Sequence, residues 1–282
     1  MEKNNKIEQF SLISESGKQV DFILENWGLT HDFSYDFLQA HRHHYFEVMI
    51  FVNGLAQHDI DFKTFKAGKG NIHFVAPDNV HLLNKEKNSK GYSLMFTSSY
   101  IDDEIIGSLP FNSNNPTLKL RSEEFKRISE LTNQIKQDLE SKQQFSAKLI
   151  RSNMETILLF LNQVATTNKQ EPKDERVPQH INTFKDLLKE NYLKHIKVED
   201  YASMLNISGK HLIEICKKHT GKTPSKLIQE QLIMEAKRQL FYTNNSIKET
   251  AYNLGFDDPA NFSHYFKSAT GYSPVVYREK KK

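Results

Sequence analysis

Hydrophobic residues in the first third of the chain come in short runs that alternate with turn signals. The runs at 46–52 and 71–75 are rich in Val, Ile and Phe, and Asn53-Gly54 follows the first of them. β-Branched and aromatic runs bounded by Gly, Pro and Asn are typical of antiparallel strands in a sandwich or barrel. The pattern therefore predicts an all-β domain over residues 1–110.

The apolar positions recur every three or four residues over 111–168, as they do on amphipathic helices. One predicted helix carries Phe125, Ile128, Leu131, Ile135 and Leu139. A second predicted helix carries Leu149, Ile150, Ile157, Leu158, Leu161 and Val164. An αα-hairpin with this much apolar surface either covers the sheet or pairs with a second copy of the chain, and both interpretations are open.

The segment at 169–178 is polar and charged and ends at Pro178, a composition that predicts a linker. Residues 179–282 have helical periodicity throughout, and N-cap residues or prolines mark the helix starts. Helices are predicted at 181–192, 198–205, 208–219, 224–242, 247–254, 259–269 and 274–278.

The C-terminal domain contains one helix-turn-helix pattern twice. In each unit a short helix with a small residue, Ala202 or Ala251, precedes a tight turn and a second helix that ends at Gly221 or Gly271. The predicted outward faces of the second helices comprise Lys210, His211, Ile213, Glu214, Lys217 and Lys218 in the first unit, and Pro259, Ala260, Asn261, Ser263, His264 and Lys267 in the second. A helix fits the major groove of DNA, where Asn, Lys and apolar side chains contact bases or phosphates. A helical bundle with a solvated polar face is the alternative, and the duplication argues against it.

The helix predicted between the two units adds a geometric argument. Its 19 residues, 224–242, span about 28 Å at a rise of about 1.5 Å per residue. Two recognition helices on one face of B-DNA lie about 34 Å apart, so this length suits a spacer between adjacent major-groove segments. Charge also fits a polyanionic partner: residues 178–282 carry 17 Lys plus Arg against 11 Asp plus Glu, whereas the net charge of the whole chain is only +3.

The second helix-turn-helix unit and its exit resemble the AraC/XylS family of bacterial transcription regulators. The resemblance is carried by Ile247, Ala251, Leu254, Gly255, Phe256, Phe262, Ser263, Phe266, Lys267, Thr270, Gly271, Ser273, Pro274, Tyr277 and Arg278. It implies sequence-specific binding to double-stranded promoter DNA through both recognition helices, with RNA polymerase as a further partner of an activator. The chain departs from the family's usual polar pattern at Ile213 and Glu214. We hypothesise that these two residues contact a thymine methyl and a cytosine amino group, or else that the first unit binds DNA less specifically than the second.

Candidate ligand-binding residues gather in the β-rich domain. Strand alternation places His41, His43 and Glu47 on one face, and His81 follows in a later segment. Imidazoles together with a carboxylate form a donor set suited to Fe, Mn, Ni or Zn. The spacing resembles the two motifs of the cupin fold, although the second motif lacks the glycine expected between Pro77 and His81.

The cupin resemblance implies a small double-stranded β-helix, which is also the sensor domain of many AraC/XylS regulators. Such domains often bind an organic effector without metal, so a metal-free pocket and a bound divalent metal are both open. Candidate effector contacts are His41, His43, Phe46, Glu47, Met49, His58, Phe74, His81 and Tyr92. Of these, we expect Phe46, Met49, His58, Phe74 and Tyr92 to face the interior of the barrel. The predicted fold class is multidomain α+β, with a cupin-like β-barrel (1–110), a helical hairpin for dimerisation (111–168) and an all-α domain with two helix-turn-helix units (179–282).

Composition bounds the remaining possibilities. A length of 282 residues favours two domains, and the single cysteine, Cys216, excludes an internal disulfide and a cysteine-based zinc site. Without an apolar leader or an apolar run of membrane length, we expect a cytoplasmic protein. The sequence thus predicts a homodimeric, effector-controlled transcription regulator without catalytic residues. A metal-dependent cupin enzyme with an appended helical module is the alternative, and the lack of an exposed aromatic platform disfavours RNA binding.

Overall fold

The computed structural model describes residues 6–14, 17–28, 39–109, 111, 115–141, 143–167 and 179–280. The chain divides into two compact units, Glu8–Asp174 in one and Glu175–Lys282 with Met1–Ile7 in the other. The predicted linker at 169–178 lies outside the described residues. In the described part of the chain, no helix is both long enough and apolar enough to cross a membrane.

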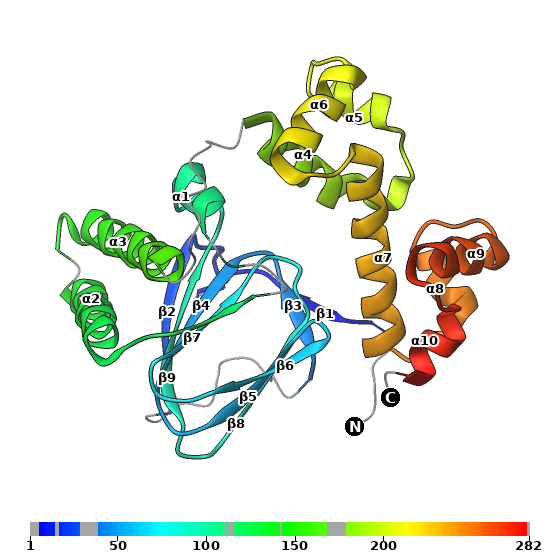
Figure 1. The fold of residues 1–282 in the computed structure, drawn as a ribbon. Coiled ribbons are helices and arrows are strands. Elements are labelled where there is room, and N and C mark those ends of the chain that lie inside the picture. The colour runs from blue at the N-terminus through cyan, green and yellow to red at the C-terminus, as the bar shows by residue number, and fades with distance from the viewer. Residues whose placement is uncertain are drawn as a thin grey trace. The chain divides into compact units, whose positions relative to one another are not determined.

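The first unit is built on two five-stranded sheets that face each other (Figure 1). One sheet comprises, in spatial order, β1 (Glu8–Phe10), β3 (His41–His43), β8 (His81–Lys85), β5 (Ala56–Ile60) and β6 (Lys63–Ala67). The other comprises β10 (Thr117–Lys119), β7 (Asn71–Val75), β4 (Phe46–Asn53), β9 (Lys90–Phe96) and β2 (Phe22–Trp27). The β-rich class predicted for this unit is confirmed. Because β10 pairs with β7, the sheet extends past the predicted domain boundary at residue 110.

Strand β4 is buried on both faces. Its antiparallel register with β7 pairs Val48 with Phe74 and Met49 with His73. Val48 and Phe74 belong to a core shared with the helices, whereas Met49 packs with Trp27 in a separate cluster that also draws on β5 and β6. Burial of both faces explains why the sequence of this strand is a continuous apolar run instead of an alternating one.

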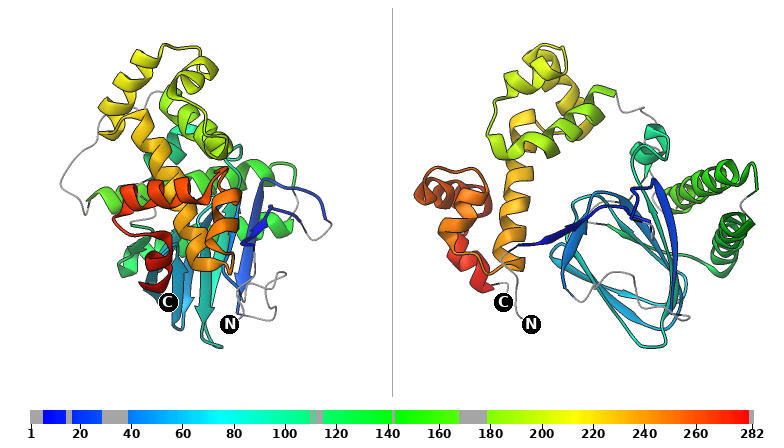
Figure 2. Two further views of the ribbon diagram at one scale, coloured as in Figure 1. Left: turned by 90° about the vertical axis from the view of Figure 1, so that its right-hand side faces the viewer. Right: turned by 180° about the vertical axis from the view of Figure 1, so that it is seen from behind.

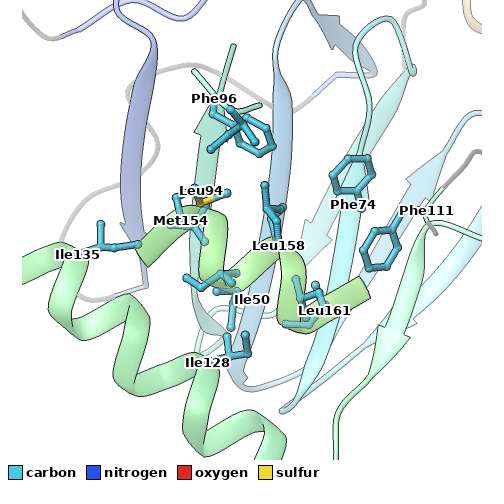
Figure 3. Packing of buried hydrophobic residues seen from close by; sticks show 14 of the residues in the cluster. Ile50, Phe74, Leu94, Phe96, Phe111, Ile128, Ile135, Met154, Leu158 and Leu161 are labelled. Atoms are coloured by element: carbon cyan, nitrogen blue, oxygen red, sulfur yellow. The ribbon is translucent and has the colours of Figure 1, made fainter. Parts of the chain in front are cut away.

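Three helices complete the first unit: α1 (Asp103–Ser108), α2 (Ser122–Ser141) and α3 (Ser146–Thr167). The last two form the predicted hairpin and pack on one face of the β4 sheet (Figure 3). Ile128 and Ile135 of α2 and Met154 and Leu158 of α3 are fully buried in this core beside Ile50. Each such side chain contributes about 1.5–3 kcal/mol by leaving water. The hairpin therefore covers the sheet, which is one of the two interpretations that the sequence leaves open.

Three residues predicted to face the barrel interior lie in this helix-covered core instead. Phe46 stacks on Phe96 with 5.3 Å between ring centroids, Phe74 stacks on Phe111 at 5.1 Å, and Tyr92 packs against the same cluster. The predicted inward orientation of Phe46, Phe74 and Tyr92 is wrong. Neighbouring positions on a strand face opposite sides, and here the hairpin buries the outer side as thoroughly as the inner one.

The second unit is helical and is organised around one long helix (Figure 2). Its elements are α4 (Gln179–Asn191), η1 (Tyr192–Lys194), α5 (Val198–Met204), α6 (Gly209–Thr220), α7 (Pro224–Tyr242), α8 (Ile247–Asn253), α9 (Pro259–Thr270) and α10 (Pro274–Lys280). Each end of α7 packs into a different core. Leu227 and Ile228 lie against the core of α4, α5 and α6, whereas Leu232, Ala236 and Leu240 belong to the core of α8, α9 and α10.

Candidate nucleic-acid interface and effector site

The first helix-turn-helix unit consists of α5 and α6. The turn between them passes through Asn206 at φ +55°, and the Ile207 amide donates to the Ala202 carbonyl at 3.0 Å. The Ser208 side chain then accepts from the His211 amide at 3.1 Å, which caps the N-terminus of α6. At the other end Gly221 takes the left-handed conformation at φ +71°. The capped ends fix where α6 begins and ends.

The second unit, α8 and α9, repeats this construction. The Phe256 amide donates to the Ala251 carbonyl at 3.0 Å, and Gly255 at φ +79° stands where the first unit has Asn206. The Asp258 side chain caps α9 by accepting from the Ala260 amide at 2.9 Å. The two units thus share the turn hydrogen bond and a side-chain cap on the second helix, although the second turn is one residue longer.

The faces predicted to contact DNA are largely exposed. On α6 the exposed residues are Lys210, His211, Ile213, Glu214, Lys217 and Lys218. On α9 they are Ala260, Asn261, His264 and Lys267, while Pro259 and Ser263 are half-buried. The opposite faces hold Leu212 and Cys216 in one unit and Phe262 and Phe266 in the other, all of them buried. Both second helices can therefore enter a groove without disturbing a core.

A cluster of five buried histidines lies between the two sheets of the first unit. We name it the histidine cluster, and it consists of His41, His43, His58, His73 and His81. Strands β3, β5 and β8 of one sheet and β7 of the other contribute these rings. The Glu47 carboxylate of β4 joins them, with Oε2 3.5 Å from Nε2 of His43. A buried group of this kind is uncommon without a function or a full set of hydrogen bonds.

Hydrogen bonds connect most of these rings. His58 Nε2 lies 3.0 Å from His81 Nδ1, and His58 Nδ1 lies 3.1 Å from His73 Nδ1, so three rings form a chain from one sheet to the other. His43 Nδ1 donates to the Tyr45 carbonyl at 2.7 Å. Each neutral imidazole has one donor and one acceptor nitrogen, so every such bond constrains the tautomer of the ring.

Burial lowers the pKa of four rings of the cluster, which keeps His41, His58, His73 and His81 uncharged at neutral pH. Loss of hydration lowers the pKa of His41 and of His73 to about 4. The same loss, reinforced by neighbouring imidazoles, lowers the pKa of His58 and of His81 well below 6.5. Neutral imidazoles carry a free lone pair, the form in which histidine binds metals or accepts hydrogen bonds.

The structure brings together most of the residues predicted for the effector site. His43, Glu47 and His81 place their donor atoms within 4.8 Å of one another. The His41 ring lies 4.3 Å from the His81 ring between centroids but is outside this group of three. His58 lies in the cluster as well.

Met49 packs with Trp27 and Phe51. Phe51 in turn contacts the histidine cluster, with 4.9 Å between its ring centroid and that of His73. Sequence reasoning missed His73. Its position opposite the inward-facing Met49 was the available signal, but that depends on knowing which strands pair.

Two exposed, similarly capped recognition helices in one unit and a buried donor cluster in the other define a transcription regulator with a DNA-binding domain and a ligand-binding domain. Family models agree: residues 27–157 match an AraC-like ligand binding domain, and residues 201–280 match a helix-turn-helix domain. The chain belongs to the AraC/XylS family of transcription regulators.

Relatives match over most of their length. The HTH-type transcriptional regulator YfiF of Bacillus subtilis is 25% identical over 283 residues, which cover 93% of this chain and 84% of YfiF. The transcriptional activator RhaS of an Enterobacter species is 21% identical and covers 85% of this chain and 87% of RhaS. Among solved structures, fatty acid-bound ToxT of Vibrio cholerae aligns with 92% of this chain and 95% of its own, at 12% identity and a TM-score of 0.40.

Proposed function

We propose that α6 and α9 of one chain bind two successive major-groove segments of a promoter. The observation that carries this proposal is the duplication: two units with the same turn hydrogen bond and a glycine cap hold their second helices at opposite ends of the 19-residue α7. The length of α7, about 28 Å at about 1.5 Å per residue, approaches the 34 Å repeat of B-DNA.

Base recognition is assigned to the exposed side chains of both helices. The Asn261 amide can pair with adenine through two hydrogen bonds, Ile213 can contact a thymine methyl, and Glu214 can accept from a cytosine amino group. Lys217 and Lys267, one turn or more further along their helices, provide phosphate contacts.

The test is selection of binding sites from random double-stranded DNA by the purified chain, followed by fluorescence anisotropy on the selected site. We expect Asn261→Ala to weaken binding about 5- to 150-fold and to relax preference at one base pair, since a bidentate contact contributes about 1–3 kcal/mol. Lys217→Ala should lower the slope of log affinity against log salt by about one. Lys126→Ala in α2 removes the same charge from the other unit and should change neither. Unchanged base preference in both Asn261→Ala and Glu214→Ala would contradict the assignment.

Control by a small molecule is assigned to the first unit. An effector held among the inward-facing residues of the barrel shifts the balance between DNA-binding-competent and incompetent arrangements only as far as it binds one of them better. Support comes from the buried donors of the histidine cluster and from the match to a ligand-binding domain model. Addition of the effector should therefore change the affinity for selected DNA.

Dimerisation is assigned to the hairpin α2 and α3. Four large apolar side chains of this hairpin stay exposed although its other side packs on the sheet: Leu139, Phe145, Leu149 and Leu159. Leu139 comes from α2, Phe145 from the connection and the other two from α3, and exposed apolar side chains that lie together form interaction surfaces. In analytical ultracentrifugation we expect Leu149→Glu to shift a dimer toward monomer, whereas Leu55→Glu, the same change at an exposed site in the barrel, leaves it a dimer. A monomeric native chain would refute this part.

An enzyme is the second candidate, because two imidazoles and a carboxylate also form catalytic metal sites. A regulator accounts for both units, whereas an enzyme would leave the recognition helices without a role. We place this regulator in the cytoplasm, and RNA polymerase is its proposed partner if it activates transcription. Turnover by the metal-loaded chain with candidate small molecules would favour the enzyme.

A further inference from the structure

Donor atoms in the histidine cluster face each other without partners. Nε2 of His43 and Nε2 of His81 are buried, and neither has a hydrogen-bond partner among the described residues. The Glu47 side chain beside them is buried, and its contact with His43 Nε2, at 3.5 Å, is electrostatic. A buried polar atom left unpaired costs about 1–3 kcal/mol, so this arrangement favours a bound group that satisfies all three residues at once.

The separation of the donors sets the size of that group. First-row divalent ions take histidine nitrogen and carboxylate oxygen at about 2.0–2.2 Å, which puts two ligands of a tetrahedral site about 3.4 Å apart. The 3.5 Å between His43 Nε2 and Glu47 Oε2 fits this spacing. The three donors all lie within 4.8 Å of one another, close enough to share one ion. Two imidazoles with one carboxylate are the donor set of many Zn²⁺ and Fe²⁺ sites.

We propose that this site binds a divalent first-row transition metal ion through His43, Glu47 and His81. The inference names the ligand class of the effector site and rests on the function proposed above. His41 flanks the site and is not assigned as a ligand, which distinguishes the site from the four-residue set that the sequence suggests.

The hydrogen bonds around the site prepare His43 for this role. Because the Tyr45 carbonyl can only accept, His43 Nδ1 carries the proton and Nε2 presents its lone pair to the ion. The rings of His43 and Tyr45 also stack, with 4.0 Å between centroids and 5° between planes, which fixes the orientation of the His43 imidazole. Backbone carbonyls that accept from the second nitrogen are a common support of histidine ligands.

His81 depends on two further histidines for its tautomer. A lone pair on His81 Nε2 requires the proton on Nδ1, from which it is donated to His58 Nε2. The His58 proton then lies on Nδ1 and is donated to His73 Nδ1. His58 and His73 are therefore positioning residues that act through His81, and metal binding selects one of the two proton arrangements open to this chain of rings.

The experiment is a titration of the EDTA-treated full chain with Co²⁺, followed by visible absorption, with Zn²⁺ as the competitor. We expect one Co²⁺ per chain with the ligand-field bands of a nitrogen and oxygen site, displaced by Zn²⁺, which binds such donors more tightly. Glu47→Gln and His43→Gln should weaken Co²⁺ binding more than about 100-fold, beyond the effect of a supporting residue. His44→Gln, an exposed ring one residue away, should bind like the native chain. Absence of Co²⁺ uptake, or equal uptake by Glu47→Gln, overturns the site.

Two substitutions of His58 test whether the hydrogen-bonded rings of His58 and His73 position His81. A glutamine at position 58 can accept from His81 and donate to His73, whereas leucine can do neither. His58→Leu should weaken Co²⁺ binding about 10- to 100-fold, and His58→Gln should recover most of the loss. Urea unfolding of each metal-free variant, followed by Trp27 fluorescence, shows that the fold is retained. Equal Co²⁺ affinity for His58→Leu and the native chain overturns the positioning role.

Binding to selected DNA, measured on the same samples with Zn²⁺ and with EDTA, separates the two proposals. Failure to take up Co²⁺ together with intact DNA selection overturns the metal site and leaves the regulator standing. Uptake of Co²⁺ by a chain that selects no DNA sequence supports the metal site and overturns the proposed function. A change in DNA affinity between Zn²⁺ and EDTA that Glu47→Gln abolishes supports both.

Discussion

Acid should destabilise the barrel through its buried histidines, and His73, whose ring is fully buried, gives the contribution that can be worked out. Its pKa is lowered by burial to about 4 in the folded chain, against 6.5 for an accessible ring. Between these two pH values His73 is protonated in the unfolded chain but not in the folded chain. The contribution of neutral His73 to the free energy of unfolding is therefore complete above pH 6.5 and is lost as the pH falls toward 4. At about 1.4 kcal/mol per pKa unit, the loss between pH 7 and pH 5 is about 2 kcal/mol.

The single tryptophan makes this measurable in the barrel alone. Trp27 is buried, with its ring 5.3 Å from that of Phe51 between centroids. Urea unfolding of the metal-free chain, followed by Trp27 fluorescence at pH 7 and pH 5, gives the free energy of unfolding at each pH. We expect the loss between the two pH values to be about 2 kcal/mol smaller in His73→Gln than in the native chain, and unchanged in His44→Gln. Equal losses in the native chain and His73→Gln would refute the reasoning.

Three predictions concern the second unit, and hydrogen exchange of peptides from α8 and α9 measures each of them. Phe266→Ala, at a fully buried site, should lower the stability of α9 by about 3–5 kcal/mol, and unchanged protection would contradict its role in the core. Ser246→Ala removes the side-chain cap of α8 and should cost about 1 kcal/mol. Gly255→Ala should cost about 1–3 kcal/mol, since φ is +79° and a Cβ would overlap the Leu193 carbonyl. As a control, Gly209→Ala at the start of α6, where a Cβ has open space, should not lower the protection of peptides from α6.

The helical unit could be predicted from sequence because its signals are local. Several helix starts have a side-chain cap, such as Ser208 or Asp258, and each recognition helix ends at a glycine in the left-handed region. Amphipathic periodicity also separated the buried Phe262 from the exposed Asn261 without reference to any distant residue. These features lie within a few residues of one another along the chain.

The barrel was predictable as a class but not in its interior. Phe46 and Phe74 were assigned to the wrong face because a strand buried on both sides has no polar face to orient it. The histidine cluster depends on pairing between distant strands: His58 reaches His81 across β5 and β8 and His73 across the two sheets. His73 sits in an apolar run, Asn71–Val75, where a single histidine is indistinguishable from a core residue.

Helix α7 is uninterrupted and has a core at each end, so its length in residues sets the angle between the two recognition helices about its axis. Each residue added within it would turn one recognition helix about 100° around the axis relative to the other and move it about 1.5 Å. One inserted alanine would therefore aim the two recognition helices at different sides of a duplex, and it would strain contacts that also join the two halves, such as the 2.8 Å hydrogen bond between His195 Nε2 and the Leu254 carbonyl. Seven inserted residues would nearly restore the angle between the recognition helices but would increase their separation along the α7 axis by about 10 Å. The exposed residues of α6 and α9 can therefore change without disturbing a core, whereas the number of residues in α7 is fixed by geometry.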